Sequence, residues 1–160
     1  MNIVHIVGRS KNGKTELIIN LVREMKRRGI KVGTLKHSGH AHDLDKPGKD
    51  SYRHREAGAE PAAIATTDQM AAYLPRAPEE NPFDRLAPLF DNCDIILVEG
   101  YSHGPGKNIE VWRSASEAEP VFREREDILA VVTDDPLTTD LPVWPRQDVK
   151  LLVDRIMEIR

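Results

Sequence analysis

The sequence has one cysteine, no long apolar run and no excess of basic charge. Cys93 has no second cysteine with which to form an intramolecular disulfide, and its place before an apolar stretch indicates a small packing residue. No apolar run is long enough to span a bilayer, and no signal peptide is recognisable. The net charge of −3 does not indicate a general nucleic-acid binder. These absences predict a cytoplasmic protein that binds neither nucleic acid nor membrane.

The remaining composition is that of an ordinary folded domain. The chain has 160 residues, of which 39% are hydrophobic and 31% charged. This length suits one domain and buries a sizeable core. We therefore expect residues 1–160 to form a single domain.

The most informative motif is a complete G-x-x-x-x-G-K-[ST] phosphate loop near the start of the chain. Its predicted nucleotide-binding residues are Gly8, Arg9, Ser10, Lys11, Asn12, Gly13, Lys14 and Thr15. The apolar residues 3–7 predict a buried strand before it, and apolar residues at helical spacing predict a helix up to Gly29. A strand, a glycine loop and a helix in this order favour a working phosphate loop over an ordinary turn.

The loop predicts a division of labour among its side chains. Gly8 and Gly13 allow backbone conformations in which successive N–H groups point at phosphate. Lys14 is the candidate catalytic lysine that reaches the β- and γ-phosphates, and the Thr15 hydroxyl is a candidate Mg²⁺ ligand.

Residues 30–36 predict a second strand, joined to the first by a right-handed crossover that implies parallel pairing. The polar segment 37–51 then predicts a long, switch-like loop that is mobile without ligand and ordered with it. Three acids in it are candidate Mg²⁺ ligands and two lysines are candidate phosphate contacts: Asp43, Asp45 and Asp50, with Lys46 and Lys49. The histidines at 37, 40 and 42 leave a transition-metal site open as an alternative.

The middle of the chain predicts smaller elements. Residues 50–57 predict a short helix, and residues 61–66 and 69–74 predict two short strands. A further helix begins at residue 81 or 82 and is interrupted by Pro88.

Residues 94–100 give the second landmark, an apolar strand that ends in an acid and a glycine. Such a strand delivers a carboxylate to the catalytic edge of a sheet. Glu99 is therefore a candidate catalytic and metal-binding residue, and Gly100 a candidate for close approach to the γ-phosphate. The alternative is an acid that merely ends a strand.

The last third predicts strands at 108–113, 127–133 and 142–144 and an amphipathic helix at 148–159. Asp134 and Asp135 follow one of these strands and are candidates for binding the guanine N1 and N2 hydrogens. A plain turn before Pro136 is the alternative. Together the elements predict a three-layer α/β P-loop NTPase fold: a mostly parallel sheet with helices on both faces and a peripheral antiparallel extension.

Four segments in order, GRSKNGKT, LKHSGHAHDLDKPGKDSYRHREAGA, DIILVEGYS and ILAVVTDD, resemble the molybdopterin-guanine dinucleotide biosynthesis protein B family (MobB type). The resemblance covers nearly the whole chain. It implies a homodimeric, GTP- and Mg²⁺-binding adaptor that assists the guanylyltransferase joining GMP to molybdopterin, with weak GTP hydrolysis and possible contact with molybdopterin or its carrier.

Carried over by position, the resemblance implies roles for the phosphate loop, for the V-E-G residues Glu99 and Gly100, and for a family loop. The matching loop residues are His37, Asp43, Asp45, Gly48, Lys49, Asp50, Ser51 and Arg53. Ser102 stands where the family often has a lysine, so the resemblance implies no contact by a lysine at this position. A small-molecule kinase, an ATP-dependent ligase and a metal-delivery GTPase remain alternative interpretations.

Overall fold

The computed structural model describes residues 2–39, 43–77, 79–101 and 104–159. It contains two compact units, a larger one of Met1–Ser38 and Leu86–Arg160 and a smaller one of Gly39–Arg85. In the described residues, no helix is both long and apolar enough to cross a membrane.

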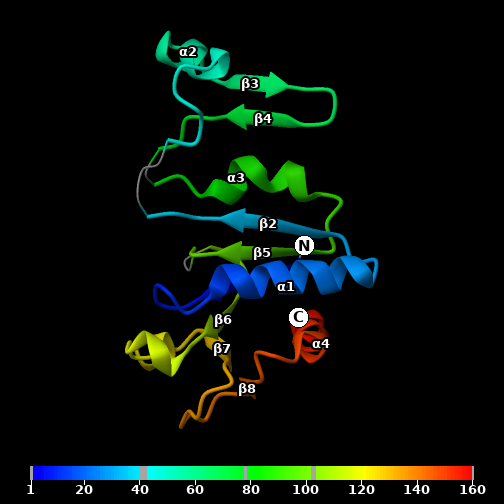
Figure 1. The fold of residues 1–160 in the computed structure, drawn as a ribbon, viewed down its shortest axis with the longest axis vertical. Helices are drawn as coiled ribbons and strands as arrows, with labels where there is room; N and C mark the ends of the chain where they lie inside the picture. Colours follow the sequence, from blue (N-terminus) through cyan, green and yellow to red (C-terminus); the bar gives the residue numbers. More distant parts are fainter. Residues whose placement is uncertain (1, 40–42, 78, 102–103, 160) are drawn as a thin grey trace. The chain divides into compact units, whose positions relative to one another are not determined.

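The larger unit is built on a six-stranded sheet (Figure 1). In the order β2-β5-β1-β6-β7-β8, its strands are Val32–Lys36, Ile95–Glu99, Asn2–Val7, Lys107–Val111, Ile128–Val132 and Val143–Trp144. Every neighbouring pair is parallel. The carboxyl ends of all six strands therefore lie at one edge, which is where open α/β sheets bind ligands.

The order of the strands corrects one prediction. β1 and β2 are parallel as expected, but they do not pair with each other, because β5 lies between them. β1 instead pairs with β5 on one side and β6 on the other. Five of its six residues are buried, as a central strand requires. This insertion places Glu99 beside the strand that carries the phosphate loop.

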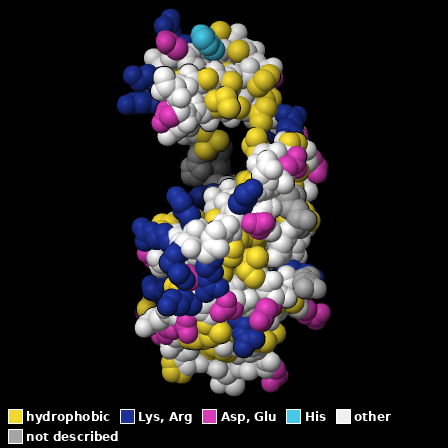
Figure 2. Space-filling model, turned by 90° about the vertical axis from the view of Figure 1, so that its right-hand side faces the viewer, with side chains coloured by type: hydrophobic (Ala, Val, Ile, Leu, Met, Phe, Trp, Pro, Cys, Tyr) yellow, Lys and Arg dark blue, Asp and Glu magenta, His cyan; other side chains and the backbone are white. Residues whose placement is uncertain are grey.

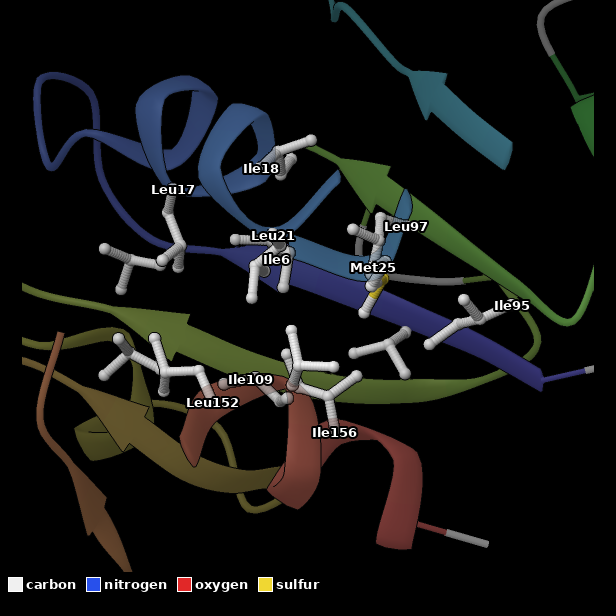
Figure 3. Packing of buried hydrophobic residues seen from close by; sticks show 14 of the residues in the cluster. Ile6, Leu17, Ile18, Leu21, Met25, Ile95, Leu97, Ile109, Leu152 and Ile156 are labelled. Carbon is white, nitrogen blue, oxygen red and sulfur yellow. The ribbon is translucent and has the colours of Figure 1, made fainter. Parts of the chain in front are cut away.

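One face of the sheet is covered by two long helices, α1 (Lys14–Arg27) and α4 (Val149–Glu158). Figure 3 shows Leu17, Leu21 and Met25 of α1 and Leu152 and Ile156 of α4 in one cluster with sheet residues such as Ile6 and Ile109. At the end of α1, Gly29 has φ 77° and ends the helix as predicted. The guanidinium of Arg28 then binds the carboxylate of Asp154 and, at 2.9 Å, the carbonyl of Lys150, so it ties the two helices together.

The opposite face is covered by loops and 3₁₀ turns. The ring of His5, which is fully buried, lies 2.8 Å from the carbonyl oxygen of Pro105. The carboxylate of Glu110 accepts hydrogen bonds from the backbone N–H groups of Val121 (2.6 Å) and Phe122 (2.8 Å), at the start of the 3₁₀ turn η3 (Val121–Arg123). Burial raises the pKa of Glu110, and the two N–H groups oppose that rise.

The helix predicted from residue 81 or 82 is split in two. It forms α3 (Pro82–Leu86) and then the 3₁₀ turn η1 (Ala87–Phe90). Pro88 has no N–H to donate and disfavours a continuous α-helix. The ring of Phe90 packs against Gly33 of β2, where an added Cβ would lie 2.6 Å from it. Cys93 packs at the same place, 3.2 Å from that position, as expected of a small packing residue.

Besides most of α3, the smaller unit contains α2 (Asp50–Glu56) and the antiparallel strands β3 (Ala62–Ala65) and β4 (Met70–Tyr73). One face of this hairpin holds Ala62, which is buried, and Tyr73, whose ring lies 5.1 Å from the guanidinium of Arg55 in α2. The other face is entirely apolar and exposed, and it is formed by Ala63, Ala65, Met70 and Ala72. Figure 2 shows hydrophobic side chains gathered on this unit.

Candidate nucleotide-binding site

The phosphate loop connects β1 to α1 at the carboxyl edge of the sheet (Figure 1). Gly8 has φ 139°, and a Cβ there would lie 2.4 Å from the carbonyl oxygen of Val111 on β6. Gly13 has φ 79° and is the N-cap of α1. Only glycine takes such conformations without strain, so both motif glycines are required by the geometry. Lys11, between them, also has a positive φ of 65°.

Lys14 lies across this loop. Its Nζ donates hydrogen bonds to the carbonyl oxygens of Gly8 (2.8 Å) and Arg9 (2.9 Å). Burial lowers the pKa of the Lys14 ammonium; the charge of Glu99 opposes this and that of Lys36 adds to it. An anion within the loop would stabilise the charged ammonium and offset the cost of its burial.

Glu99 joins the phosphate loop to β2. Its Oε1 accepts hydrogen bonds from Thr15 Oγ1 (2.7 Å) and from Lys36 Nζ (2.9 Å). Glu99 is in register with Lys36 of β2, and the adjacent β1 leads directly into the loop. Burial acts to raise the pKa of Glu99, but the hydrogen bonds and charges of Lys36, Thr15 and Lys14 outweigh it, so the pKa is lowered. The carboxylate is therefore ionised beside the hydroxyl.

These oxygen atoms suit a hard cation. Mg²⁺ is usually held by one or two protein oxygens together with phosphate oxygens and water. The hydroxyl of Thr15 and the carboxylate of Glu99 supply this kind of donor at the start of α1, next to Lys14. The residues present thus fit a magnesium–triphosphate group. Glu99 ends β5 and also contacts the phosphate loop, while its metal-binding and catalytic roles stay predictions.

Gly100 sits where β5 and β2 end together. The backbone N–H of His37 donates to the carbonyl of Glu99 at 2.8 Å. Gly100 has φ 78°, and a Cβ on it would lie 2.7 Å from the carbonyl oxygen of His37. The geometry explains the glycine through its close approach to His37, and the predicted contact of Gly100 with phosphate stays a prediction.

The two candidate guanine-binding acids lie in different environments. Asp135 Oδ2 accepts hydrogen bonds from the backbone N–H (2.7 Å) and the hydroxyl (2.9 Å) of Ser114, at the start of the 3₁₀ turn η2 (Ser114–Ser116). The N–H group of Ser114 is the main cause of the lowered pKa of Asp135. Asp134 is exposed, and its Oδ1 accepts a hydrogen bond from the N–H of Gln147 at 3.2 Å.

Two further basic residues, Lys36 and Arg146, belong to this edge and were not among the site residues predicted from the sequence. The position of Lys36 could be predicted from the sequence, because Lys36 ends a parallel strand and such strand ends lie at the same edge as the phosphate loop. Arg146, which follows β8, belongs to no motif from which its contact with the phosphate loop could be predicted. Its Nη2 donates to the carbonyl oxygen of Gly13 at 3.2 Å, 133 residues away in sequence.

The other predicted site residues belong to the smaller unit. Asp45 is buried, and its Oδ1 accepts hydrogen bonds from the N–H of Lys46 (2.8 Å) and the hydroxyl of Ser51 (3.2 Å). Lys49 is the N-cap residue of α2, and Asp43 is exposed. The metal roles of Asp43 and Asp45 and the nucleotide role of Lys49 stay predictions.

The transition-metal alternative depends largely on residues outside the described part of the chain, because His40 and His42 lie there. The ring of His37 lies 4.7 Å from that of Tyr101. Among the described residues, no group of three or more His, Cys, Asp or Glu side chains is arranged to hold a metal ion.

Comparison with known proteins identifies the family. A sequence model of the family described as "MobB: Molybdopterin guanine dinucleotide synthesis protein B" matches residues 3–134, which include the phosphate loop, Glu99 and Asp134. The chain belongs to the MobB family. This confirms the resemblance seen in the sequence.

Relatives of this MobB-family chain extend over most of its length. It is 37% identical over 155 residues to the molybdopterin-guanine dinucleotide biosynthesis adapter protein of Escherichia coli, covering 93% of this chain and 87% of that one. It is 37% identical over 140 residues to the protein of the same name from Haemophilus influenzae, covering 86% of this chain and 78% of that one.

Solved structures of MobB proteins have the same fold. A crystal structure of molybdopterin-guanine biosynthesis protein B superposes with a TM-score of 0.73 at 27% identity, covering 98% of this chain and 97% of that one. The structure of Bacillus subtilis MobB gives a TM-score of 0.72 at 23% identity and covers 98% and 96%. The predicted fold, a mostly parallel sheet with helices and an antiparallel extension in a P-loop nucleotide-binding architecture, is confirmed. The prediction of helices on both faces is corrected in one detail, because 3₁₀ turns and loops cover the face opposite α1 and α4.

Proposed function

We propose that the chain binds GTP with Mg²⁺ at the loop of residues 8–15 and works as one nucleotide-binding domain. The observation that carries this proposal is the convergence of Lys14, Thr15 and Glu99 at one edge of the sheet. Lys14 would move from the loop carbonyls to the phosphates. Mg²⁺, when bound, neutralises charge on the phosphate oxygens, and Thr15 and Glu99 would hold it.

Guanine is the proposed base, and Asp134 is its proposed acceptor. A carboxylate that accepts from N1–H and N2–H is left unpaired by adenine, whose N1 is itself an acceptor. Asp135 is already engaged by both donors of Ser114, whereas Asp134 is exposed at the same edge. Of the two acids predicted from the sequence, the geometry supports Asp134.

The proposed role is that of an adapter in the attachment of GMP to molybdopterin. Two relatives that are 37% identical are named as adapter proteins of molybdopterin-guanine dinucleotide biosynthesis. The partner would be the guanylyltransferase that joins the two groups. Hydrolysis of GTP by the chain itself would be weak, since Glu99 is held by Thr15 and Lys36 rather than free to orient a water.

A homodimer is the proposed assembly. The exposed face of the β3–β4 hairpin is apolar at all four positions, and Met70 on it is 87% exposed. Exposed apolar faces of this kind mark interaction sites in soluble proteins. A second copy of the same face would cover it symmetrically.

Calorimetric titration of the purified protein with GTP and ATP, each with Mg²⁺ and with a chelator, tests the nucleotide proposal. We expect GTP to bind more tightly than ATP and Mg²⁺ to strengthen both. Binding of neither triphosphate would overturn the proposal. Tighter binding of ATP would favour the small-molecule kinase or ligase interpretation.

A further inference from the structure

The strands β7 and β8 bring a carboxylate and a guanidinium to the same end of the sheet. Val132 and Trp144 are the last paired residues of the two parallel strands, and the N–H of Thr133 donates to the carbonyl of Trp144 at 3.0 Å. Asp134 and Arg146 each follow two residues beyond these paired positions. They therefore leave the sheet side by side.

Both loops are fixed in place by hydrogen bonds. Asp134 reaches the loop after β8 through the N–H of Gln147. Arg146 reaches the phosphate loop through the carbonyl of Gly13, which also accepts the first helical hydrogen bond of α1, from the N–H of Leu17 at 3.1 Å. A Cβ on Gly13 would lie 2.5 Å from the Arg146 guanidinium, so the arginine lies directly against the start of the helix.

Arg146 has further N–H donors that can bind a ligand in this position. A guanidinium carries five N–H donors in a fixed planar fork. Within the described residues, the bond to Gly13 uses one of them. The arginine is half-buried, which holds the fork in place while leaving part of it accessible.

The chemistry of guanine matches this pair. Guanine presents N1–H and N2–H donors beside its O6 acceptor, whereas adenine has an acceptor at N1 and a donor at the 6-position. A carboxylate and a guanidinium side by side complement the donors and the acceptor of guanine. On adenine, the carboxylate would face the N1 acceptor and the guanidinium would face the 6-amino donor.

We propose that Asp134 and Arg146 form a guanine-binding pair, in which Asp134 accepts from N1 and N2 and Arg146 donates to O6. This inference rests on the proposed function and adds Arg146 as a specificity-determining residue. Arg146 lies outside the residues 3–134 that match the family model. Arg146 contacts Gly13 of the phosphate loop, so in this proposal one side chain would contact both the base and the loop.

The test compares Arg146→Met with the native protein by titration with four triphosphates. GTP and ITP carry O6, whereas ATP and 2-aminopurine riboside triphosphate do not. A lost charge-assisted hydrogen bond predicts that the Kd for GTP and ITP rises about ten- to hundredfold. The Kd for the two nucleotides without O6 should change little. Asp134→Asn should weaken the binding of GTP. It should strengthen the binding of XTP, which has an acceptor in place of the N2 donor.

Arg155→Met is the matched control, because Arg155 is an exposed arginine of α4 that pairs with Glu158 at 3.3 Å. It removes one positive charge away from the carboxyl edge and should leave all four constants unchanged. Urea denaturation of each variant reports whether it is folded.

The outcomes separate the inference from the proposal beneath it. If the native protein prefers GTP but Arg146→Met weakens all four triphosphates equally, Arg146 only fixes the phosphate loop and the pair is overturned. Unchanged constants in that variant overturn it as well. If the native protein binds no triphosphate, the proposed function fails and the pair fails with it.

Discussion

Gly100 offers a sharp test of how the carboxyl edge is assembled. Replacing it with alanine places a Cβ at a φ of 78° and 2.7 Å from the carbonyl oxygen of His37. Gly29→Ala is a matched control, since Gly29 has φ 77° and nothing within 4 Å of the added atom. The two variants share the conformational cost, and only one of them adds a steric clash.

The magnitudes follow from these two costs. A left-handed conformation costs an alanine about 1–2 kcal/mol, which both variants lose from the free energy of unfolding. Forcing a methyl group against a backbone carbonyl adds about 1–3 kcal/mol, as in other overpacked sites. We therefore expect Gly100→Ala to lose about 2–5 kcal/mol and Gly29→Ala only the first part.

Urea denaturation followed by tryptophan fluorescence measures both values. The clash would also push apart the ends of β2 and β5, which carry Lys36 and Glu99. Mg²⁺-dependent GTP affinity should therefore fall in Gly100→Ala and stay unchanged in Gly29→Ala. Equal losses in the free energy of unfolding would show that the close contact with the His37 carbonyl adds no steric cost, and the reasoning would be refuted.

Three other substitutions test separate parts of the structure. Lys14→Ala should weaken GTP binding at least about a hundredfold while the protein stays folded, because charge-assisted bonds to phosphate are lost; unchanged affinity in calorimetry would contradict this. Glu110→Gln should lower the free energy of unfolding by about 1–3 kcal/mol, because one amide oxygen replaces two carboxylate oxygens that accept from Val121 and Phe122. The pKa of Glu110 is raised above its usual 4.5, so the native advantage over this variant should shrink as the pH rises from 4.5 through that pKa; a difference independent of pH would oppose the assignment. Met70→Glu should produce monomers in sedimentation velocity, whereas Leu44→Glu, at a residue that is 82% exposed and outside the hairpin, should not.

Local patterns in the sequence predict much of the fold. The phosphate loop, its strand and its helix were predictable because spacing, apolar periodicity and glycine positions act over a few residues. The strand ending at Glu99 was predictable for the same reason. The strands β3 and β4 and the final helix α4 also lie where the sequence places them, with each bound shifted by one residue.

The tertiary structure decided what depends on distant residues. Pairing of β1 with β5 rather than β2 joins segments about ninety residues apart, and no local pattern specifies it. It is this pairing that brings Glu99 to Thr15. Ser114 binds Asp135, which makes Asp134 the proposed guanine acceptor, and Arg146 contacts Gly13. Sequence determined which groups the edge of the sheet could offer, whereas the packing of the strands determined which of those groups meet, because hydrogen bonds form only between groups that the fold brings within reach.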